Sequence, residues 1–485
     1  MNKPIRRVSI FCLVLILALM VRTNWVQGVQ ADAWATNKNN KRQIYDRYAH
    51  PRGNIIVDGQ PVTQSAFVNG LRYKYKRSWV DGPMYAPVTG YSSQAFGASQ
   101  LEQLEDGVLS GNDDRLFFRN TLDMLTGEPK KGGDVVTTIN AKAQKAAFEG
   151  LGNKKGAVVA LDPRTGAILA LVSTPSYDPG VFAGNESADS KAWTDLNADP
   201  NKPMLNRALR ETYPPGSTFK LVTAAAAFEN GLYQNIDDAT KTPNPYVLPG
   251  TKTELKNESD KEQCENATLK SGMDQSCNTV YGKIGADLGK DKMRAQAEKF
   301  GFNSTVDTPV RSEKSVFPTD STPDGTALDS IGQHDTRATP LQIAMVTAAI
   351  ANNGSLMQPY LVDQERSASL TTISKHTEKQ FSQPISPATA QKLQEMMVSV
   401  VENGTGRNAR IPDLTVGGKT GTAQHGEDNA GLPFAWFTSY AKAADGRSVA
   451  VAVVVEDGSN NRDGISGGRL AAPIAKSVMQ ATLGK

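Results

Sequence analysis

Cysteine and histidine are both scarce in this sequence. Only 3 cysteines and 4 histidines occur in 485 residues, and the histidines lie far apart, at positions 50, 334, 376 and 425. The sequence has no Cys-x-x-Cys pair and no cluster of histidine with cysteine, so the ligand spacing of a structural zinc site is missing. We therefore expect neither a metal nor a cofactor.

Two of the three cysteines can be considered as a pair, and the third lies apart from them. Cys12 lies in an apolar run near the N-terminus, which leaves Cys264 and Cys277 as an even pair. In an oxidising compartment this pair can form a disulfide, whose loop of about fourteen residues would contribute roughly 3 kcal/mol in the chain-entropy account. Two unpaired, buried thiols are an equally good interpretation.

A strong charge of one sign is also missing. Lys and Arg total 53 against 50 for Asp and Glu, a net charge of +3, and the basic residues are scattered along the chain. Nucleic-acid binding needs a basic stripe or patch, so we expect no nucleic-acid partner. Repeats of fixed period and long low-complexity tracts are absent as well. At this length the chain exceeds one compact core, which predicts at least two domains.

One long apolar run is present, over residues 8–21, and basic residues precede it. The run is short for the roughly 17 to 25 residues that span a bilayer and matches a signal-peptide core, with residues 29–31 as a cleavage site. If the Arg22 side chain reaches to the membrane–water interface and Trp25 lies at that interface, the helix can instead stay uncleaved and serve as a membrane anchor. Both interpretations place the rest of the chain outside the cytoplasmic membrane, with the N-terminus inside.

These observations divide the chain into five parts. Residues 1–7 form a cytoplasmic tail, 8–26 a membrane anchor, 27–42 a polar linker, 43–145 a small non-catalytic module and 146–485 the catalytic domain. The small module has an irregular pattern with short strand-like pieces, and a polar, glycine-containing stretch marks its end.

The second domain opens and closes with strands. Residues 157–161 and 168–172 are β-rich and are joined by Asp-Pro-Arg-Thr-Gly, which predicts a hairpin. Residues 435–440 and 449–455 are strand-like again. Between them helices are expected, the clearest over residues 340–353, with Thr339 as its cap, Gln342 completing a capping box and Gly354 as its stop. Strands at both ends with helices between predict an α+β fold, an antiparallel sheet flanked by helices.

A serine and a lysine stand at the start of one such helix. Ser217 follows Pro-Pro-Gly and precedes an apolar run over residues 221–228, and Lys220 lies one turn further on the same face. A serine becomes a nucleophile when a base takes its proton, and a desolvated lysine can be that base. Alone, the Ser-x-x-Lys pattern is common, and an N-cap serine followed by a surface lysine is the ordinary interpretation.

Two further motifs follow later in the sequence. Their presence favours a catalytic role for the Ser-x-x-Lys motif over the ordinary interpretation. Ser276 and Asn278 flank Cys277 in a Ser-Cys-Asn triplet, and residues 419–422 read Lys-Thr-Gly-Thr. Ser276 can pass a proton between the base and a leaving amine, and the Asn278 amide can bind a substrate amide.

The third motif suits an extended, anionic substrate. Lys419 supplies a cation, Thr420 and Thr422 offer hydroxyl groups to a carboxylate, and Gly421 lets a peptide backbone approach closely. The strand that carries them can bind the peptide by β-addition. We predict Ser217, Lys220, Ser276 and Asn278 as catalytic residues, and the four residues of this motif as substrate ligands.

The three motifs together resemble those of the serine penicillin-recognising enzymes, Ser-x-x-Lys, Ser-Asp-Asn and Lys-Thr-Gly. Over about residues 156–485 the chain resembles the transpeptidase domain of penicillin-binding proteins. The N-terminal part resembles the pedestal or dimerisation domain of class B enzymes, and within them the actinobacterial penicillin-binding protein A group. The segments that carry the resemblance are 213–220, 339–342, 418–424, 52–55, 85–90 and 109–111. The sequence departs from the pattern at Cys277, where the family has aspartate.

The resemblance implies a reaction and its partners. Ser217 would attack the penultimate D-Ala of a peptidoglycan stem peptide, the backbone N–H groups of Ser217 and Thr422 would form the oxyanion hole, and a second stem peptide would release the acyl group as a cross-link. β-Lactams would acylate the same serine. A membrane glycosyltransferase of the shape or division type is the implied partner, because the chain has no room for a glycosyltransferase module.

Two alternatives stay open. The same fold can use water as acceptor, as a D,D-carboxypeptidase or a β-lactam-hydrolysing relative does, although we find no deacylating glutamate motif between Asn278 and Lys419. The chain could also be a non-catalytic penicillin sensor or scaffold, but only about seven residues precede the apolar run, too few for an intracellular output domain.

Overall fold

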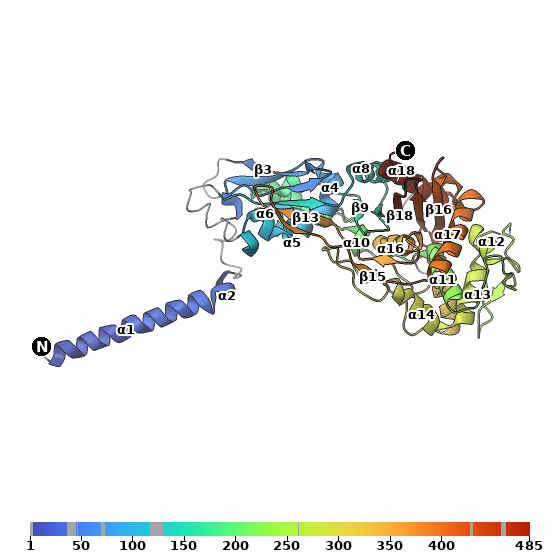
Figure 1. Cartoon of the computed structure of the whole chain (residues 1–485), viewed down its shortest axis with the longest axis horizontal. Helices are drawn as coiled ribbons and strands as arrows, with labels where there is room; N and C mark the ends of the chain where they lie inside the picture. Colours follow the sequence, from blue (N-terminus) through green and yellow to red (C-terminus); the bar gives the residue numbers. More distant parts are fainter. Residues whose placement is uncertain are drawn as a thin grey trace.

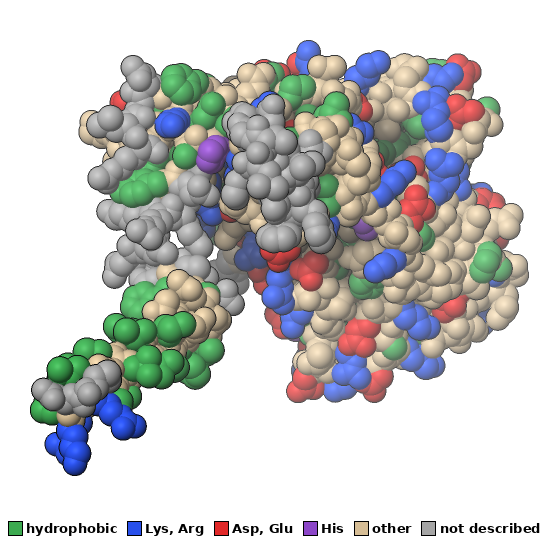
Figure 2. Space-filling view, turned by 60° about the vertical axis from the view of Figure 1, so that its left-hand side comes forward, with side chains coloured by type: hydrophobic (Ala, Val, Ile, Leu, Met, Phe, Trp, Pro, Cys, Tyr) green, Lys and Arg blue, Asp and Glu red, His purple; other side chains and the backbone are tan. Residues whose placement is uncertain are grey.

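The computed structural model of the chain describes residues 3–35, 45, 47–68, 73–116, 130–259, 261–426, 430–456 and 462–485. At the N-terminus helix α1 (Lys3–Gly28) extends away from the rest of the molecule and is followed by the short α2 (Ala31–Ala35) (Figure 1). Helix α1 is an apolar rod with basic side chains gathered at its free end (Figure 2). Its 26 residues correspond to about 39 Å, which is enough to cross a hydrocarbon layer of about 30 Å.

A mixed five-stranded sheet forms the centre of the N-terminal part, with strand order β14-β13-β7-β1-β2. The strands are β1 (Ile55–Val57), β2 (Gln60–Pro61), β7 (Asp134–Thr137), β13 (Val362–Arg366) and β14 (Thr372–Lys375). Strand β7 pairs parallel with β1 and antiparallel with β13. Two of the five strands therefore come from the C-terminal half of the chain. The boundary between residues 145 and 146 remains a prediction.

Buried charges hold the N-terminal part together beside this sheet. Glu102 on α5 (Gln100–Leu104) accepts a hydrogen bond from Arg52 at 2.7 Å and from Arg77 on β4 (Tyr75–Trp79) at 2.7 Å. The side-chain exposures are 4% for Arg52, 0% for Glu102 and 1% for Arg77. Strand β4 in turn pairs with β3 (Thr63–Phe67). Arg52 begins one of the segments that resemble class B enzymes, and its role here is to join α5 to the sheet.

The catalytic part contains an antiparallel sheet of strand order β16-β17-β18-β8-β9. The strands are β8 (Gly156–Leu161), β9 (Ile168–Thr174), β16 (Thr415–Ala423), β17 (Phe434–Lys442) and β18 (Ser448–Val455). The hairpin predicted at residues 157–172 and the C-terminal strands are confirmed. Strand β16, which carries the Lys-Thr-Gly-Thr motif, is an edge strand, so one side of its backbone is unpaired within the sheet.

Helices cover both faces of the catalytic sheet (Figure 1). Helices α8 (Ala141–Leu151) and α18 (Ala472–Leu483) pack on one face, and α16 (Pro340–Ala351) packs on the other. Alternate residues of β8 accordingly enter two different cores: Val158 and Ala160 face α8 and α18, whereas Ala157 and Val159 belong to the larger core that includes α16. This two-sided burial explains why β8 is a continuous apolar run.

Further helices of the catalytic part lie between its first and last strands in the sequence. They are α9 (Ser187–Ala198), α11 (Lys220–Glu229), α12 (Leu269–Asp274), α13 (Asn278–Leu288), α14 (Lys290–Lys299), α15 (Pro323–Asp329) and α17 (Pro387–Glu402). Helix α16 begins as predicted, with Thr339 Oγ1 accepting from the Gln342 backbone N–H at 3.1 Å. The predicted capping box is only half formed, because the Gln342 side chain donates instead to the Phe300 carbonyl at 2.7 Å. The α+β fold class is confirmed.

Candidate active site

Ser217 lies in a tight turn that two other segments hold in place. The turn is the 3-10 segment Gly216–Phe219, which continues into α11. The Gly216 N–H donates to the Gly332 carbonyl at 2.9 Å, and Trp436 on β17 donates to the Pro214 carbonyl at 3.1 Å. Gly332 has a positive φ of +75, and a Cβ there would lie 2.2 Å from the Gly216 oxygen. Only glycine therefore permits this close approach.

The amine of Lys220 is buried and fully engaged, although not with Ser217. It donates to the Ser276 carbonyl at 2.6 Å and to Asn278 Oδ1 at 2.8 Å, and lies 3.4 Å from Ser276 Oγ. In the part of the chain that the structure describes, Ser217 Oγ has no hydrogen-bond partner. The contact that the helical spacing predicted between the two side chains is thus not a hydrogen bond here. Catalytic hydrogen bonds often form fully only with substrate bound, so a missing bond between these two side chains does not exclude Lys220 as the base.

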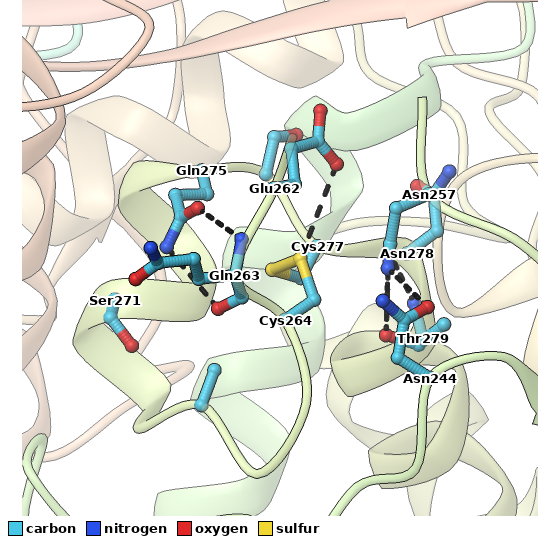
Figure 3. Close-up of a disulfide and its surroundings, with 12 residues drawn as sticks. Asn244, Asn257, Glu262, Gln263, Cys264, Ser271, Gln275, Cys277, Asn278 and Thr279 are labelled. Atoms are coloured by element: carbon cyan, nitrogen blue, oxygen red, sulfur yellow. Dashed lines mark hydrogen bonds between the residues drawn. A yellow bond between two sulfur atoms is a disulfide. The ribbon is translucent and has the colours of Figure 1, made fainter. Parts of the chain in front are cut away.

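The middle motif is locally strained. Ser276 has a φ of +63, a left-handed conformation that is uncommon for serine, and Cys277 follows as the cap of α13. The structure contains a disulfide between Cys264 and Cys277, and both residues are completely buried (Figure 3). Cys277, one of the two bridged residues, thus lies directly between Ser276 and Asn278 in the sequence. Cys277 occupies the middle position without pointing at the lysines, because its sulfur faces the preceding loop.

Lys419 completes a chain of polar contacts across the site. Its amine donates to Ser276 Oγ at 2.8 Å and to the Thr420 carbonyl at 3.0 Å. Ser276 therefore lies between Lys220 on α11 and Lys419 on β16, within hydrogen-bond reach of both amines. Thr420 Oγ1 is 2.7 Å from the hydroxyl of Thr405, a residue that follows α17. Three separate elements thus bring the first, second and third motifs together, as the sequence predicts.

The first and third motifs also touch through their backbones. A Cβ at Gly421 would lie 3.1 Å from the Pro215 carbonyl, and one at Gly216 would lie 3.1 Å from the Thr422 carbonyl. Strand β16 can approach the Ser217 turn this closely because both positions lack side chains. The backbones of Ser217 and Thr422 are therefore neighbours, the arrangement that a shared oxyanion hole requires.

Burial governs the electrostatics of the two lysines. It lowers the pKa of Lys220 well below its usual value, and the nearby charge of Lys419 lowers it further. Burial also lowers the pKa of Lys419, to about 8. Two ammonium groups in one dry site repel each other, so the site favours one neutral and one charged lysine. The pKa of Lys220 is lowered more strongly than that of Lys419, so Lys220 gives up its proton more readily, whereas Lys419 keeps most of its charge at neutral pH.

A cavity of about 250 Å³ opens beside these groups. Ser276, Thr420 and Thr422 line it together with Glu258 and Glu262. The sequence analysis did not identify Glu258, Glu262 or Thr405 as site residues. Acidic and hydroxyl residues in polar loops are too common to stand out, and only the folded chain brings these to the motifs. The described residues contain no group of three or more potential metal ligands.

Comparisons with known proteins agree with this geometry. Residues 156–480 match the penicillin-binding protein transpeptidase domain family, and residues 52–135 match the penicillin-binding protein A dimerisation domain family. A peptidoglycan D,D-transpeptidase PbpA of Mycolicibacterium smegmatis is 40% identical, over 100% of this chain and 99% of the relative. The predicted resemblance is confirmed.

Solved structures of penicillin-binding proteins are also similar to this chain. The ceftriaxone acyl-enzyme complex of penicillin-binding protein A from Mycobacterium tuberculosis is 39% identical and superposes with a TM-score of 0.85, covering 90% of this chain and 100% of that one. The penicillin G acyl-enzyme complex of the same protein has a TM-score of 0.84 over the same shares, also at 39% identity. The chain therefore belongs to the family of penicillin-binding proteins that carry a transpeptidase domain.

Proposed function

We propose that this chain is a peptidoglycan D,D-transpeptidase with Ser217 as its nucleophile. The observation that carries the proposal is the chain of contacts from Lys220 through Ser276 to Lys419 beside the Ser217 turn. This arrangement supplies a neutral base, a proton-relaying hydroxyl and a fixed cation around one cavity. In acyl transfer from a peptide these groups can act as the base that activates Ser217, as the relay to the leaving amine and as the ligand of the substrate carboxylate.

In the first half-reaction Ser217 Oγ bonds to the carbonyl carbon of the penultimate D-Ala, and Lys220 takes the hydroxyl proton. The developing oxyanion is stabilised by the backbone N–H groups of Ser217 and Thr422. The carbon–nitrogen bond to the terminal D-Ala then breaks. Ser276 lies within reach of both lysine amines and relays the proton to the leaving nitrogen, which departs as free D-Ala.

Substrate recognition falls to the third motif and to Asn278. Lys419 keeps its charge at neutral pH and, with the hydroxyls of Thr420 and Thr422, faces the carboxylate of the donor peptide. The unpaired side of β16 receives the extended peptide as an added strand. β-Lactams carry the same carboxylate and a reactive amide, so they would acylate Ser217 and remain attached.

The N-terminal helix supports a location for the protein at the cytoplasmic membrane and a partner in the same membrane. Helix α1 is long and apolar enough to anchor the chain, with basic residues on the cytoplasmic side and the catalytic part outside the cytoplasmic membrane. A signal sequence passes the same test of length and composition. A membrane glycosyltransferase of the shape or division type would supply the glycan strands, with contacts through the anchor and the N-terminal part.

The test compares wild type with Ser217→Ala and Lys220→Ala. A fluorescent penicillin should label the wild type and leave Ser217→Ala unlabelled, whereas Lys220→Ala should be labelled at least about a hundredfold more slowly. Equal labelling of the serine variant would refute its role. Lipid-linked stem peptide with an amine acceptor then separates the alternatives. A cross-linked product supports transpeptidation, and release of D-Ala without one supports a carboxypeptidase.

A further inference from the structure

A second cavity lies where the N-terminal and catalytic parts of the molecule meet. Its volume is about 530 Å³, whereas the cavity beside the catalytic lysines measures about 250 Å³. Residues between positions 91 and 104 line it from the N-terminal part, and residues between 177 and 311 line it from the catalytic part. The volume falls within the roughly 300 to 1,000 Å³ of ordinary small-molecule sites. None of the described residues that line it belongs to the three motifs, so this cavity is separate from the catalytic one.

Asn206 fastens the two parts of the molecule to each other at the wall of this second cavity. It precedes α10 (Arg207–Arg210), and its Nδ2 donates to the Pro87 carbonyl on α4 (Gly82–Thr89) at 2.9 Å and to Gln100 Oε1 at 3.0 Å. The residue is 6% exposed, and its Oδ1 has no hydrogen-bond partner among the described residues. A buried acceptor without a donor is unfavourable, so a ligand that offered it an N–H or O–H group would be stabilised.

Aromatic rings supply much of the apolar part of the cavity wall. Tyr91, Tyr177 and Trp193 line it. Trp193 on α9 is held in place, because Phe96 stacks on its ring with the centroids 4.6 Å apart and Tyr91 contacts the ring edge-to-face at 5.4 Å. These two contacts join α9 of the catalytic part to the N-terminal part. The rings are therefore already ordered before a ligand binds, which lowers the entropic cost of binding.

The rest of the wall is polar, and its charged groups are positive. Two guanidinium groups line the cavity, those of Arg210 and Arg311, and no aspartate or glutamate is among the lining residues that the structure describes. Arg210 donates to the Arg311 carbonyl at 3.2 Å and makes a long salt bridge of 3.9 Å to Glu313, between side chains that are 47% and 51% exposed. Arg311 forms no salt bridge within the described ranges. Both guanidinium groups therefore keep donors for an anionic ligand. Four amide side chains complete the polar wall: Gln100, Gln103, Asn197 and Asn206.

Aromatic rings, planar amides and arginines in one cavity suit a sugar that carries acid groups. The apolar faces of sugar rings pack on aromatic rings, sugar hydroxyl groups need donors and acceptors in fixed directions, and carboxylates bind guanidinium groups through paired hydrogen bonds. If the proposed function holds, the substrate is a peptide attached to a glycan strand, and the catalytic cavity receives only the end of that peptide. We propose that the second cavity binds the glycan at the base of an acidic stem peptide. The sugar lies against the rings and amides, and the peptide carboxylates face Arg210 and Arg311.

The test measures binding to the full-length protein in detergent after penicillin has acylated Ser217. The probe is a soluble muropeptide, a disaccharide that carries an acidic tripeptide without D-alanine. Because penicillin fills the catalytic site and the probe lacks D-Ala ends, its binding reports on a separate site. Free tripeptide and unsubstituted disaccharide serve as comparison ligands, and calorimetric titration gives each Kd.

Three variants locate the binding. Arg210→Gln combined with Arg311→Gln removes the two positive charges of the wall. The matched control combines Arg164→Gln with Arg447→Gln, which removes two charges of similar exposure outside the cavity. Gln103→Glu adds a negative charge at an exposed position of the wall. Fluorescent penicillin measures the catalytic site of each variant separately.

We expect Kd for the muropeptide to rise about tenfold in the double arginine variant and about threefold in Gln103→Glu, and to stay within about twofold of wild type in the matched control. Penicillin labelling should stay within about twofold of wild type in all three. Equal Kd values for the double arginine variant and its control would overturn the proposal. So would absence of binding to wild type, or free tripeptide that binds as tightly as the muropeptide. Labelling of Ser217→Ala at the wild-type rate would instead refute the proposed function.

Discussion

The rate of penicillin acylation should depend on pH through the two buried lysines. Lys220 must be neutral to accept the Ser217 proton, so the rate rises as pH passes through its lowered pKa. Lys419 must be charged to bind the carboxylate of penicillin, so the rate falls as pH rises through its pKa of about 8. One pH unit above that value only about a tenth of Lys419 is charged, which predicts about a tenfold loss of rate near pH 9.

The Lys419→Arg variant separates the two limbs of this profile. A guanidinium stays charged over the whole range, so the falling limb near pH 8 should disappear while the rising limb remains. The Lys419→Gln variant removes the second cause of the Lys220 shift, so its rising limb should move to higher pH. The assay is the second-order rate of labelling by fluorescent penicillin, with each profile normalised to its own maximum. An unchanged falling limb in Lys419→Arg would refute the assignment of that limb to Lys419.

Three further perturbations test the architecture. Glu102→Gln leaves the buried Arg77 without a carboxylate and Arg52 with Asp106 alone, and it should lower the free energy of unfolding of the N-terminal part by about 3 to 5 kcal/mol in urea. Asp195→Asn, in an exposed pair, should change it by less than about 0.5 kcal/mol. Alkylation of the denatured protein without reductant should modify one of the three cysteines, because Cys264 and Cys277 are bonded; three modified thiols would contradict the bridge. Gly332→Ala should slow acylation at least about tenfold, since its Cβ would displace the Ser217 turn, and wild-type labelling would show that the turn tolerates it.

Local signals made much of the catalytic domain predictable. The strands over residues 157–172 and the cap of α16 depend on neighbouring residues, and the structure has them where turn and cap chemistry put them. The three motifs were recognisable because all three occur in order along one domain, although the Ser-x-x-Lys pattern alone is common. The capping box failed at Gln342 because a distant carbonyl, that of Phe300, competed for its side chain. Local patterns cannot reveal such a competitor.

The contacts that define the site came from the fold alone. Helical spacing placed Lys220 near Ser217, but the amine found better acceptors at Ser276 and Asn278, which lie more than fifty residues further along the chain. The carboxylates of Glu258 and Glu262 had no local signal either, because glutamates in a polar loop are ordinarily solvated. Tertiary contacts bring that loop to the motifs: the disulfide, the hydrogen bonds between Gln263 and Gln275, and the contact of Asn278 with the Lys256 carbonyl.

The pairing of β13 with β7 also has a consequence for biogenesis. The N-terminal sheet contains two strands, β13 and β14, that end at Lys375, while its other strands lie before Thr137. During synthesis from the N-terminus, one edge of β7 stays unpaired until the chain has been made as far as β13. The N-terminal sheet is thus among the last parts of the molecule to be completed, and a chain truncated before β13 would expose a sheet edge that invites aggregation.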